Sequence, residues 1–285
     1  MKRWRSALQW GAGIALLAVL AWQFDATAIG SRLLAVDPVL LATGLVSMVA
    51  ANVLSALRWR SIAADMGCTR PAEGFLVRYA QGVCLNTVLP GATLGGDAWR
   101  SAWLVGPGFS LARAGLTVVL DRVAGLWMLA TMAVAGTLMS TAEVPDVLSA
   151  GLALLMLGPM AIWLPWVARL ATRIGVPSWT NPMWRHASIQ SAGVQALSCA
   201  GLWCSCQAVG VNPDLPATLV LAGGLFIAAA LPASVFGFGS REAAAAWLFP
   251  VFGIGADAGV AASIVFGLLG TLQGLLYLPL WWRRH

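Results

Sequence analysis

Residues 89–100 read LPGATLGGDAWR, and an altered copy, LPASVFGFGSRE, occupies residues 231–242. In each stretch a leucine-proline pair is followed, five residues after the proline, by a glycine, Gly95 in the first and Gly237 in the second. Proline ends a helix and glycine lets the backbone turn sharply. Both stretches therefore predict two short helices joined by a bend.

Both motifs lie inside apolar surroundings, the first within Gly74–Val105 and the second within Pro216–Phe252. Of the 285 residues, 59% are hydrophobic and 10% are charged, against about half and about a quarter in a typical soluble domain. This composition excludes an ordinary cytosolic globule and a nucleic-acid-binding chain. Broken helices at membrane depth are tolerated only where protein or a water-filled cavity surrounds them, so we interpret both regions as re-entrant hairpins.

Six further stretches are near or above the roughly 20 residues that cross a bilayer core. Their continuous apolar character predicts helices rather than barrel strands. They are Ala7–Phe24, Pro38–Leu57, Ala114–Met139, Val147–Val167, Ser188–Val211 and Ala258–Trp281. The predicted fold class is an all-α polytopic membrane protein with six transmembrane helices and two re-entrant helical hairpins, forming a single domain over residues 1–285.

The basic residues agree with this count of crossings. With a cytoplasmic N-terminus, Arg32 alone falls outside among the loop Lys and Arg residues, as the positive-inside rule favours. The residues that fall inside are Lys2, Arg3, Arg5, Arg58, Arg60, Arg70, Arg113, Arg169, Arg173, Arg185, Arg283 and Arg284. We therefore expect a multi-pass protein of the plasma or bacterial inner membrane with both termini cytoplasmic. The segment Ala26-Thr27-Ala28 resembles a signal-peptidase site, which leaves cleavage of the first span as an alternative.

The two motifs are offset by 142 residues, about half the chain. The halves, about 1–142 and 143–285, each contain two spans, a hairpin and a span. Three crossings per half make the second half inverted relative to the first, so the hairpins would enter from opposite sides. Broken segments at matching positions of inverted halves point to a transporter's substrate site.

Seven charged residues lie inside the predicted membrane segments, where an ion costs about 2.5 to 3.5 kcal/mol on insertion scales. Two opposed helix N-termini, each beside an arginine, suit an anion such as a lipid phosphate. Besides Arg78, the charged and neutral residues expected there form the candidate substrate site: Asn86, Gly95, Gly96, Asp97, Arg100, Asp121, Arg122, Ser234, Gly237, Gly239, Ser240, Arg241 and Glu242.

Arg100 and Arg241 are expected to bind the headgroup, and Asp97 and Glu242 to hold these arginines or exchange protons with them. An alternative is that these pairs only brace the bends, and Asp121 can either contact a hairpin arginine or serve substrate directly. We expect no metal and no cofactor, because the five cysteines and two histidines form no ligand cluster and no nucleotide-binding loop is present. The sequence also offers no nucleophile–histidine pair for catalysis.

Read together, these motifs resemble the lysylphosphatidylglycerol synthase transmembrane-region family. The resemblance rests on Asn86 with Leu89-Pro90, on Gly95-Gly96-Asp97 with Arg100, on Asp121-Arg122, and on the Leu231-Pro232, Ser234, Gly237, Gly239 and Arg241-Glu242 series. It implies an integral membrane translocase, since the domain in well-understood members moves aminoacylated phosphatidylglycerol between leaflets. Those members also carry a soluble aminoacyltransferase domain, which we do not expect here because the chain ends three residues after Trp282.

The resulting hypothesis is a flippase for a lipid with an anionic phosphate headgroup, such as aminoacyl-phosphatidylglycerol or a polyprenyl-phosphate-linked lipid. Its expected partners are membrane lipids, a separate lipid synthase or glycosyltransferase, and a second copy of the chain in a homo-oligomer. Two alternatives stay open: a membrane-embedded transferase acting on a lipid phosphate with Asp97 or Glu242 as general base, and an accessory subunit of a lipid or glycolipid pathway.

Overall fold

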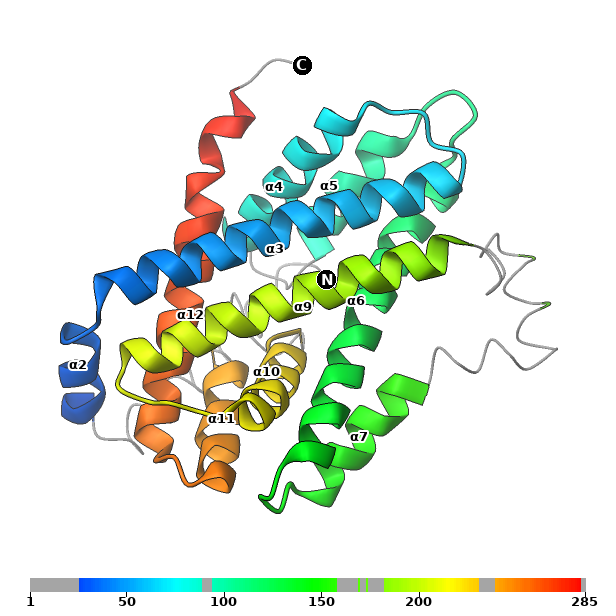
Figure 1. Ribbon diagram of the computed structural model, residues 1–285. Coiled ribbons are helices and arrows are strands. Elements are labelled where there is room, and N and C mark those ends of the chain that lie inside the picture. The colour runs from blue at the N-terminus through cyan, green and yellow to red at the C-terminus, as the bar shows by residue number, and fades with distance from the viewer. Residues whose placement is uncertain are drawn as a thin grey trace, which may run out of the picture.

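The computed structural model describes residues 26–88, 94–157, 169, 173, 182–230 and 239–282, and all regular elements in these ranges are helical (Figure 1). This confirms the predicted all-α class at the level of secondary structure. The elements are α2 (Ala26–Leu34), α3 (Pro38–Asp65), α4 (Ala72–Val88), α5 (Leu94–Leu104), α6 (Leu111–Met139), α7 (Asp146–Leu157), α9 (Pro182–Ala208), α10 (Leu215–Ala230), α11 (Ser240–Leu248), η2 (Phe249–Phe252), α12 (Ala256–Leu276) and η3 (Leu278–Trp281).

Three of the described helices are long and apolar enough to cross a membrane: α3, α6, and α12 continued through η3. The start of α3 follows from local chemistry, because Asp37 accepts a hydrogen bond from the Val39 amide and Pro38 suits the first helical position. This helix continues past the predicted end at Leu57 to Asp65. The extension is stabilised by packing, since Trp59 and Ile62 in it are almost fully buried.

The other predicted spans have different outcomes. The span Ala7–Phe24 lies outside the described residues, and the described part of Val147–Val167 is the shorter apolar helix α7. The span Ser188–Val211 corresponds to α9, which has 27 residues but is not among the helices that satisfy the apolar criterion. Six crossings therefore remain a prediction, and three helices among the described residues have the length and composition that crossing requires.

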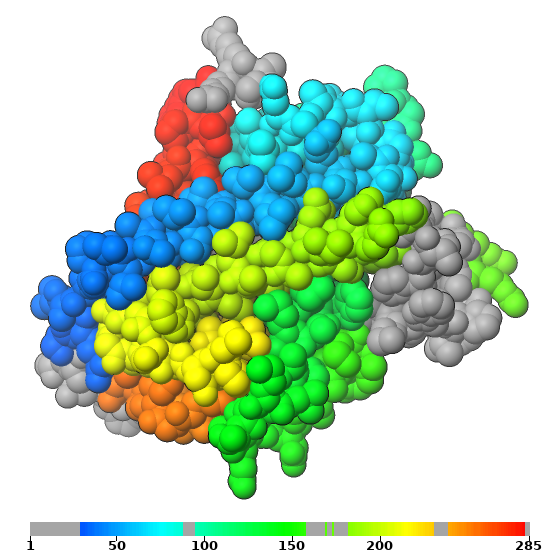
Figure 2. All heavy atoms as spheres, in the orientation of Figure 1, coloured from blue at the N-terminus to red at the C-terminus, as the bar shows by residue number. Residues whose placement is uncertain are grey.

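A long pair of helices, α3 and α9, lies side by side and forms much of the face seen in Figure 2. Small residues allow this approach. A side chain at Gly44 would meet the Cβ of Cys204 at 3.3 Å and the Gly201 carbonyl at 3.6 Å. Close packing of backbones through glycine is the usual means by which membrane helices associate, because no hydrophobic driving force acts between them in lipid.

Each of the two interrupted regions forms two helices, as predicted: α4 with α5, and α10 with α11. The bends themselves, residues 89–93 and 231–238, lie outside the described residues, and so do Ser234 and Gly237 of the candidate site. The helices α4 and α5 pack on each other and against α3 and α6, whereas α10 and α11 pack on each other and against α9 and α12. Contacts that join these groups include α3 with α9, α4 with α12 and α6 with α10.

Candidate functional site

The arms of the first hairpin meet backbone to backbone. A Cβ at Gly96 would overlap the Gly82 carbonyl oxygen and come within 2.7 Å of the Asn86 side chain. The Asn86 side-chain oxygen accepts a hydrogen bond from the Gly96 amide at 2.8 Å. The side-chain oxygen of Asn86 thus pairs a backbone N–H group in the first turn of α5 that would otherwise lack an acceptor. Gly95 is half-buried in the same turn.

Asp97 lies within the first turn of α5, which begins at Leu94. Its carboxylate binds two guanidinium groups. Asp97 Oδ1 lies 2.7 Å from Arg100 Nη2 and 2.9 Å from Arg122 Nη2, and Oδ2 accepts from Arg122 Nε at 3.2 Å. Charge-assisted hydrogen bonds of this kind are stronger than a neutral amide contact.

Asp121 continues the same network one step deeper, in α6. Its Oδ1 lies 2.8 Å from Arg58 Nε and its Oδ2 lies 3.1 Å from Arg100 Nη1. All three side chains are at most 5% exposed. The sequence-based alternative that Asp121 contacts a hairpin arginine is therefore correct for Arg100.

Arg58 belongs to the same buried network, although the sequence analysis counted it among the cytoplasmic loop residues. It lies inside α3, is 4% exposed, and also donates from Nη1 to the hydroxyl of Ser191 in α9 at 2.9 Å. The apolar run ends at Leu57, but the helix does not, and the ion pair with Asp121 compensates the buried charge of Arg58. A clue is present in the spacing, since Ala51, Ser55 and Arg58 recur on one helical face of buried residues.

The arginines of this network differ in access. The Arg122 side chain is 40% exposed, whereas that of Arg100 is 3% exposed. The Arg100 guanidinium also lies over the Tyr79 ring, 4.7 Å from the ring centroid, and 5.0 Å from that of Trp59. Arg100 is thus held on three sides, and Arg122 presents the more accessible cation.

A second charged cluster lies at the start of α11. Glu242, 1% exposed, accepts from Arg241 Nη2 at 2.9 Å and from the Ser263 hydroxyl of α12 at 2.9 Å, both on Oε1. Its other oxygen accepts from the Gly239 amide at 2.6 Å. Gly239 has φ of +95°, a conformation that favours glycine. Ser240 donates to the Ala228 carbonyl at 2.7 Å, which ties α11 to α10.

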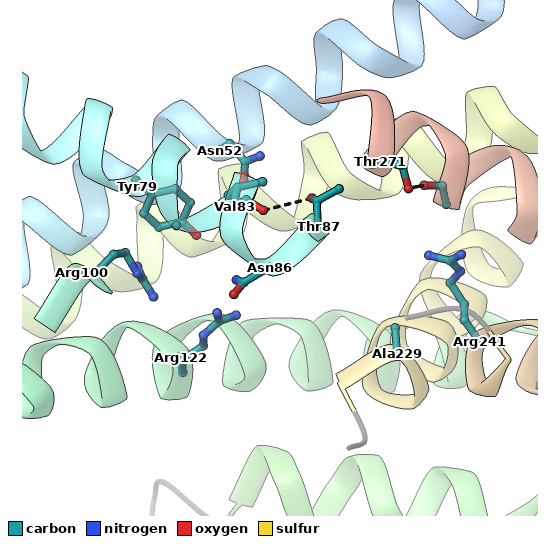
Figure 3. A pocket seen from close by; sticks show the side chains of 13 residues that line it. Asn52, Tyr79, Val83, Asn86, Thr87, Arg100, Arg122, Ala229, Arg241 and Thr271 are labelled. Atoms are coloured by element: carbon teal, nitrogen blue, oxygen red, sulfur yellow. Dashed lines mark hydrogen bonds between the residues drawn. The ribbon is translucent and has the colours of Figure 1, made fainter. Parts of the chain in front are cut away.

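Both clusters border one cavity of about 310 Å³. Figure 3 shows Arg100 and Arg122 toward one end, Arg241 toward the other, and Asn86 and Thr87 between them. The cavity thus brings together Asn86, Arg100, Arg122 and Arg241 of the predicted site. Asp97, Asp121 and Glu242 are not among the lining residues and form ion pairs with these arginines. Residues that the sequence analysis did not place here also line it: Asn52, Tyr79, Gly82, Val83, Thr87, Ala229, Gly267, Gly270 and Thr271.

The first network carries three guanidinium groups and two carboxylates, which leaves an excess of one positive charge beside the cavity. The second pairs one arginine with one glutamate and is neutral in formal charge. With amide and hydroxyl groups between them, the lining can surround an anion with hydrogen-bond donors. A lipid phosphate is an anion whose oxygen atoms accept hydrogen bonds, so it fits this lining.

Comparison with known proteins agrees with these features. No curated protein matches the chain. The family described as "Lysylphosphatidylglycerol synthase TM region" matches residues 7–276, a range that contains both hairpins and every member of the candidate site. The chain therefore belongs to the lysylphosphatidylglycerol synthase TM region family.

Proposed function

We propose that this protein is a lipid translocase that moves a lipid with an anionic phosphate headgroup between leaflets. One observation carries the proposal: a single cavity collects guanidinium groups from two broken-helix regions that are far apart in the sequence. Arg100 and Arg122 border it from the first half of the chain and Arg241 from the second. An ion inside the membrane is costly, and residues that carry one commonly mark a pathway for a substrate or ion.

The order in which the headgroup contacts these residues follows from how exposed their side chains are. Arg122 makes the first contact because it is the more accessible cation, and Asn86 and Thr87 offer neutral hydrogen bonds next to it. Arg241 offers the second guanidinium, so a phosphate that leaves one arginine can meet another within the same cavity. Asp97 and Glu242 keep the arginines in place and neutralise part of their charge when the cavity is empty.

An inverted repeat is part of the proposal, and the packing of the helices supports it. The contact of α5 with α6 has a counterpart in α11 with α12, and that of α3 with α4 has one in α9 with α10. Contacts between the halves also exchange under the same correspondence: α6 with α10 becomes α12 with α4, and α6 with α9 becomes α12 with α3. We propose that the hairpins enter from opposite sides of a bacterial inner or plasma membrane with both termini cytoplasmic, so that each half opens the cavity to one leaflet.

Membership of this family favours an aminoacylated phosphatidylglycerol or a polyprenyl-phosphate-linked lipid as the transported lipid. In either case a separate synthase or glycosyltransferase would supply the lipid. Only the shared chemistry, a phosphate diester or monoester next to an apolar tail, is needed for the geometry described above.

The test is leaflet-resolved translocation of fluorescent lipids in proteoliposomes, using aminoacylated, plain anionic and polyprenyl-phosphate lipids. We compare the wild type with Arg122→Gln and with Arg113→Gln, a control on the same helix whose side chain is exposed and borders no part of the cavity. A hydrogen bond to a charged group contributes about 1.5 to 3 kcal/mol, so Arg122→Gln should slow translocation roughly 10-fold to 100-fold. Arg113→Gln should match the wild type.

Two outcomes contradict the proposal. Equal rates for Arg122→Gln and Arg113→Gln would remove the cavity from the transport path. A lipid product of altered mass, without a change of leaflet, would instead support the transferase alternative.

A further inference from the structure

We propose that an apolar groove between α3, α4 and η3 holds one hydrocarbon chain of the lipid whose headgroup occupies the polar cavity. The inference rests on the proposed function and adds to it the route of the lipid tail. The groove has a volume of about 230 Å³ and is lined almost entirely by apolar atoms. Val53 and Ala56 contribute from α3, Leu76 and Ala80 from α4, and Leu280 from η3.

The groove adjoins the polar cavity. Asn52 and Tyr79 line both, and Figure 3 shows these two side chains in the polar cavity. Tyr79 is the closer link to the charges, because the Arg100 guanidinium stacks on its ring at 4.7 Å from the centroid. One face of Tyr79 therefore borders the anion site while the residue also forms part of the groove. A lipid has the same order of parts, a charged headgroup joined to an apolar chain.

The groove opens toward the outside of the helix bundle. Val53 is 45% exposed and Leu76 is 37% exposed, although both are apolar. On helices within a bilayer, such side chains face lipid. A chain can thus enter sideways between α3 and α4 and need not pass through the charged cavity.

The side of the groove formed by η3 is held in place by a hydrogen bond and an aromatic contact. Gln81 of α4 donates to the Leu280 carbonyl at 2.9 Å, and the rings of Trp99 and Trp281 lie 4.8 Å apart. These contacts hold η3 against the first hairpin. The groove is therefore a preformed part of the structure, which lowers the cost of ordering it around a ligand.

The apolar lining of the groove favours a lipid over a free phosphate as the ligand of the cavity and groove together. A hydrocarbon chain moves from bilayer to apolar groove at little cost, because lipid and groove are similar environments. A soluble phosphate would fill the polar cavity and leave the groove empty. The adjoining arrangement thus favours a lipid that places its headgroup and one chain in the two compartments at once.

The experiment uses photolabelling in proteoliposomes with two lipids that carry a diazirine in the same acyl chain, phosphatidylglycerol and diacylglycerol. Mass spectrometry locates the label. We expect phosphatidylglycerol to label residues 49–56 and 76–80 several-fold more than diacylglycerol, because the headgroup anchors the chain. Equal labelling by both lipids, or labelling confined to other segments, would overturn the inference.

Matched variants test the same point by transport. Val53→Trp fills the groove, whereas Val46→Trp makes the same change two turns earlier on α3, at a side chain that is 68% exposed and outside the groove. Val53→Trp should reduce lipid translocation at least 10-fold and lower groove labelling, with binding of soluble glycerophosphate unchanged. Equal transport by the two variants would refute the groove.

The two proposals fail in different ways. If the wild type moves no lipid, the translocase proposal fails, while the photolabel map still reports whether the groove holds a chain. If the wild type moves lipid but the label lies elsewhere, only the groove is wrong.

Discussion

Replacing Asp121 by asparagine gives the sharpest test of the buried network. The Asp121 carboxylate is 2% exposed and lies between the guanidinium groups of Arg58 and Arg100, themselves 5% and 3% exposed. In Asp121→Asn an amide nitrogen replaces one oxygen, so one arginine faces a donor instead of an acceptor. Removing one partner of a buried ion pair costs about 3 to 5 kcal/mol, because the remaining charge cannot reach water.

The magnitude can be measured as thermal unfolding of the purified protein in detergent. At roughly 2 to 4 °C per kcal/mol for a chain of this size, Asp121→Asn should lower the Tm by roughly 6 to 20 °C. Asp146→Asn is the control, since Asp146 is exposed at the start of α7 and should change the stability by less than about 1 kcal/mol.

A double variant separates charge from packing. Arg58→Met combined with Asp121→Leu removes one cation and one anion and leaves Arg100 with Asp97. Apolar replacement of a buried pair is often neutral, so this variant should be more stable than Asp121→Asn alone. The reasoning is refuted if Asp121→Asn unfolds within about 1 kcal/mol of the wild type, because a carboxylate that buried cannot be lost so cheaply.

Two more predictions concern packing and access. Gly96→Ala should destabilise the protein by about 1 to 3 kcal/mol, because its Cβ would overlap the Gly82 carbonyl. Gly115→Ala, whose Cβ would meet nothing within 4 Å, should be neutral or stabilising by up to about 1 kcal/mol. Thermal unfolding of both variants checks this, and equal shifts in Tm would contradict it. Among the five cysteines, a maleimide should label the half-buried Cys68 first, and peptide mapping that finds the fully buried Cys206 labelled equally fast would show that α9 is more open than described.

The helical class and the two-helix form of each interrupted region could be predicted from the sequence, because proline, glycine and hydrophobicity act locally. The pairing within each cluster was also accessible, since Asp97 and Arg100 lie one turn apart and Arg241 and Glu242 are neighbours. Such local patterns need no knowledge of which helices meet.

Which of the cavity arginines is the more exposed could not be predicted, because this depends on contacts between distant helices. Asp121 and Arg122 are neighbours in α6, yet successive residues point about 100° apart on a helix. One therefore meets Arg58 and Arg100 in the interior, whereas the other reaches Asp97 at the cavity. The burial of Arg58 by Ser191 needs the packing of α3 on α9, which no local pattern in either helix reveals.

The glycine contact between α4 and α5 also limits how this protein can change shape. Because Gly96 rests on the backbone of Gly82, sliding of α4 along α5 would break this close contact and the hydrogen bond from Gly96 to Asn86. If the two helices move as a unit, α5 would slide along α6, where Arg100 touches Asp121. A displaced α5 would carry Arg100 and Asp97 away together, separating Asp97 from Arg122 and leaving Asp121 with Arg58. In the proposed translocase, an anionic headgroup that replaces Asp121 beside Arg100 would thus favour the displaced position, so that the lipid itself would select the conformation that holds it.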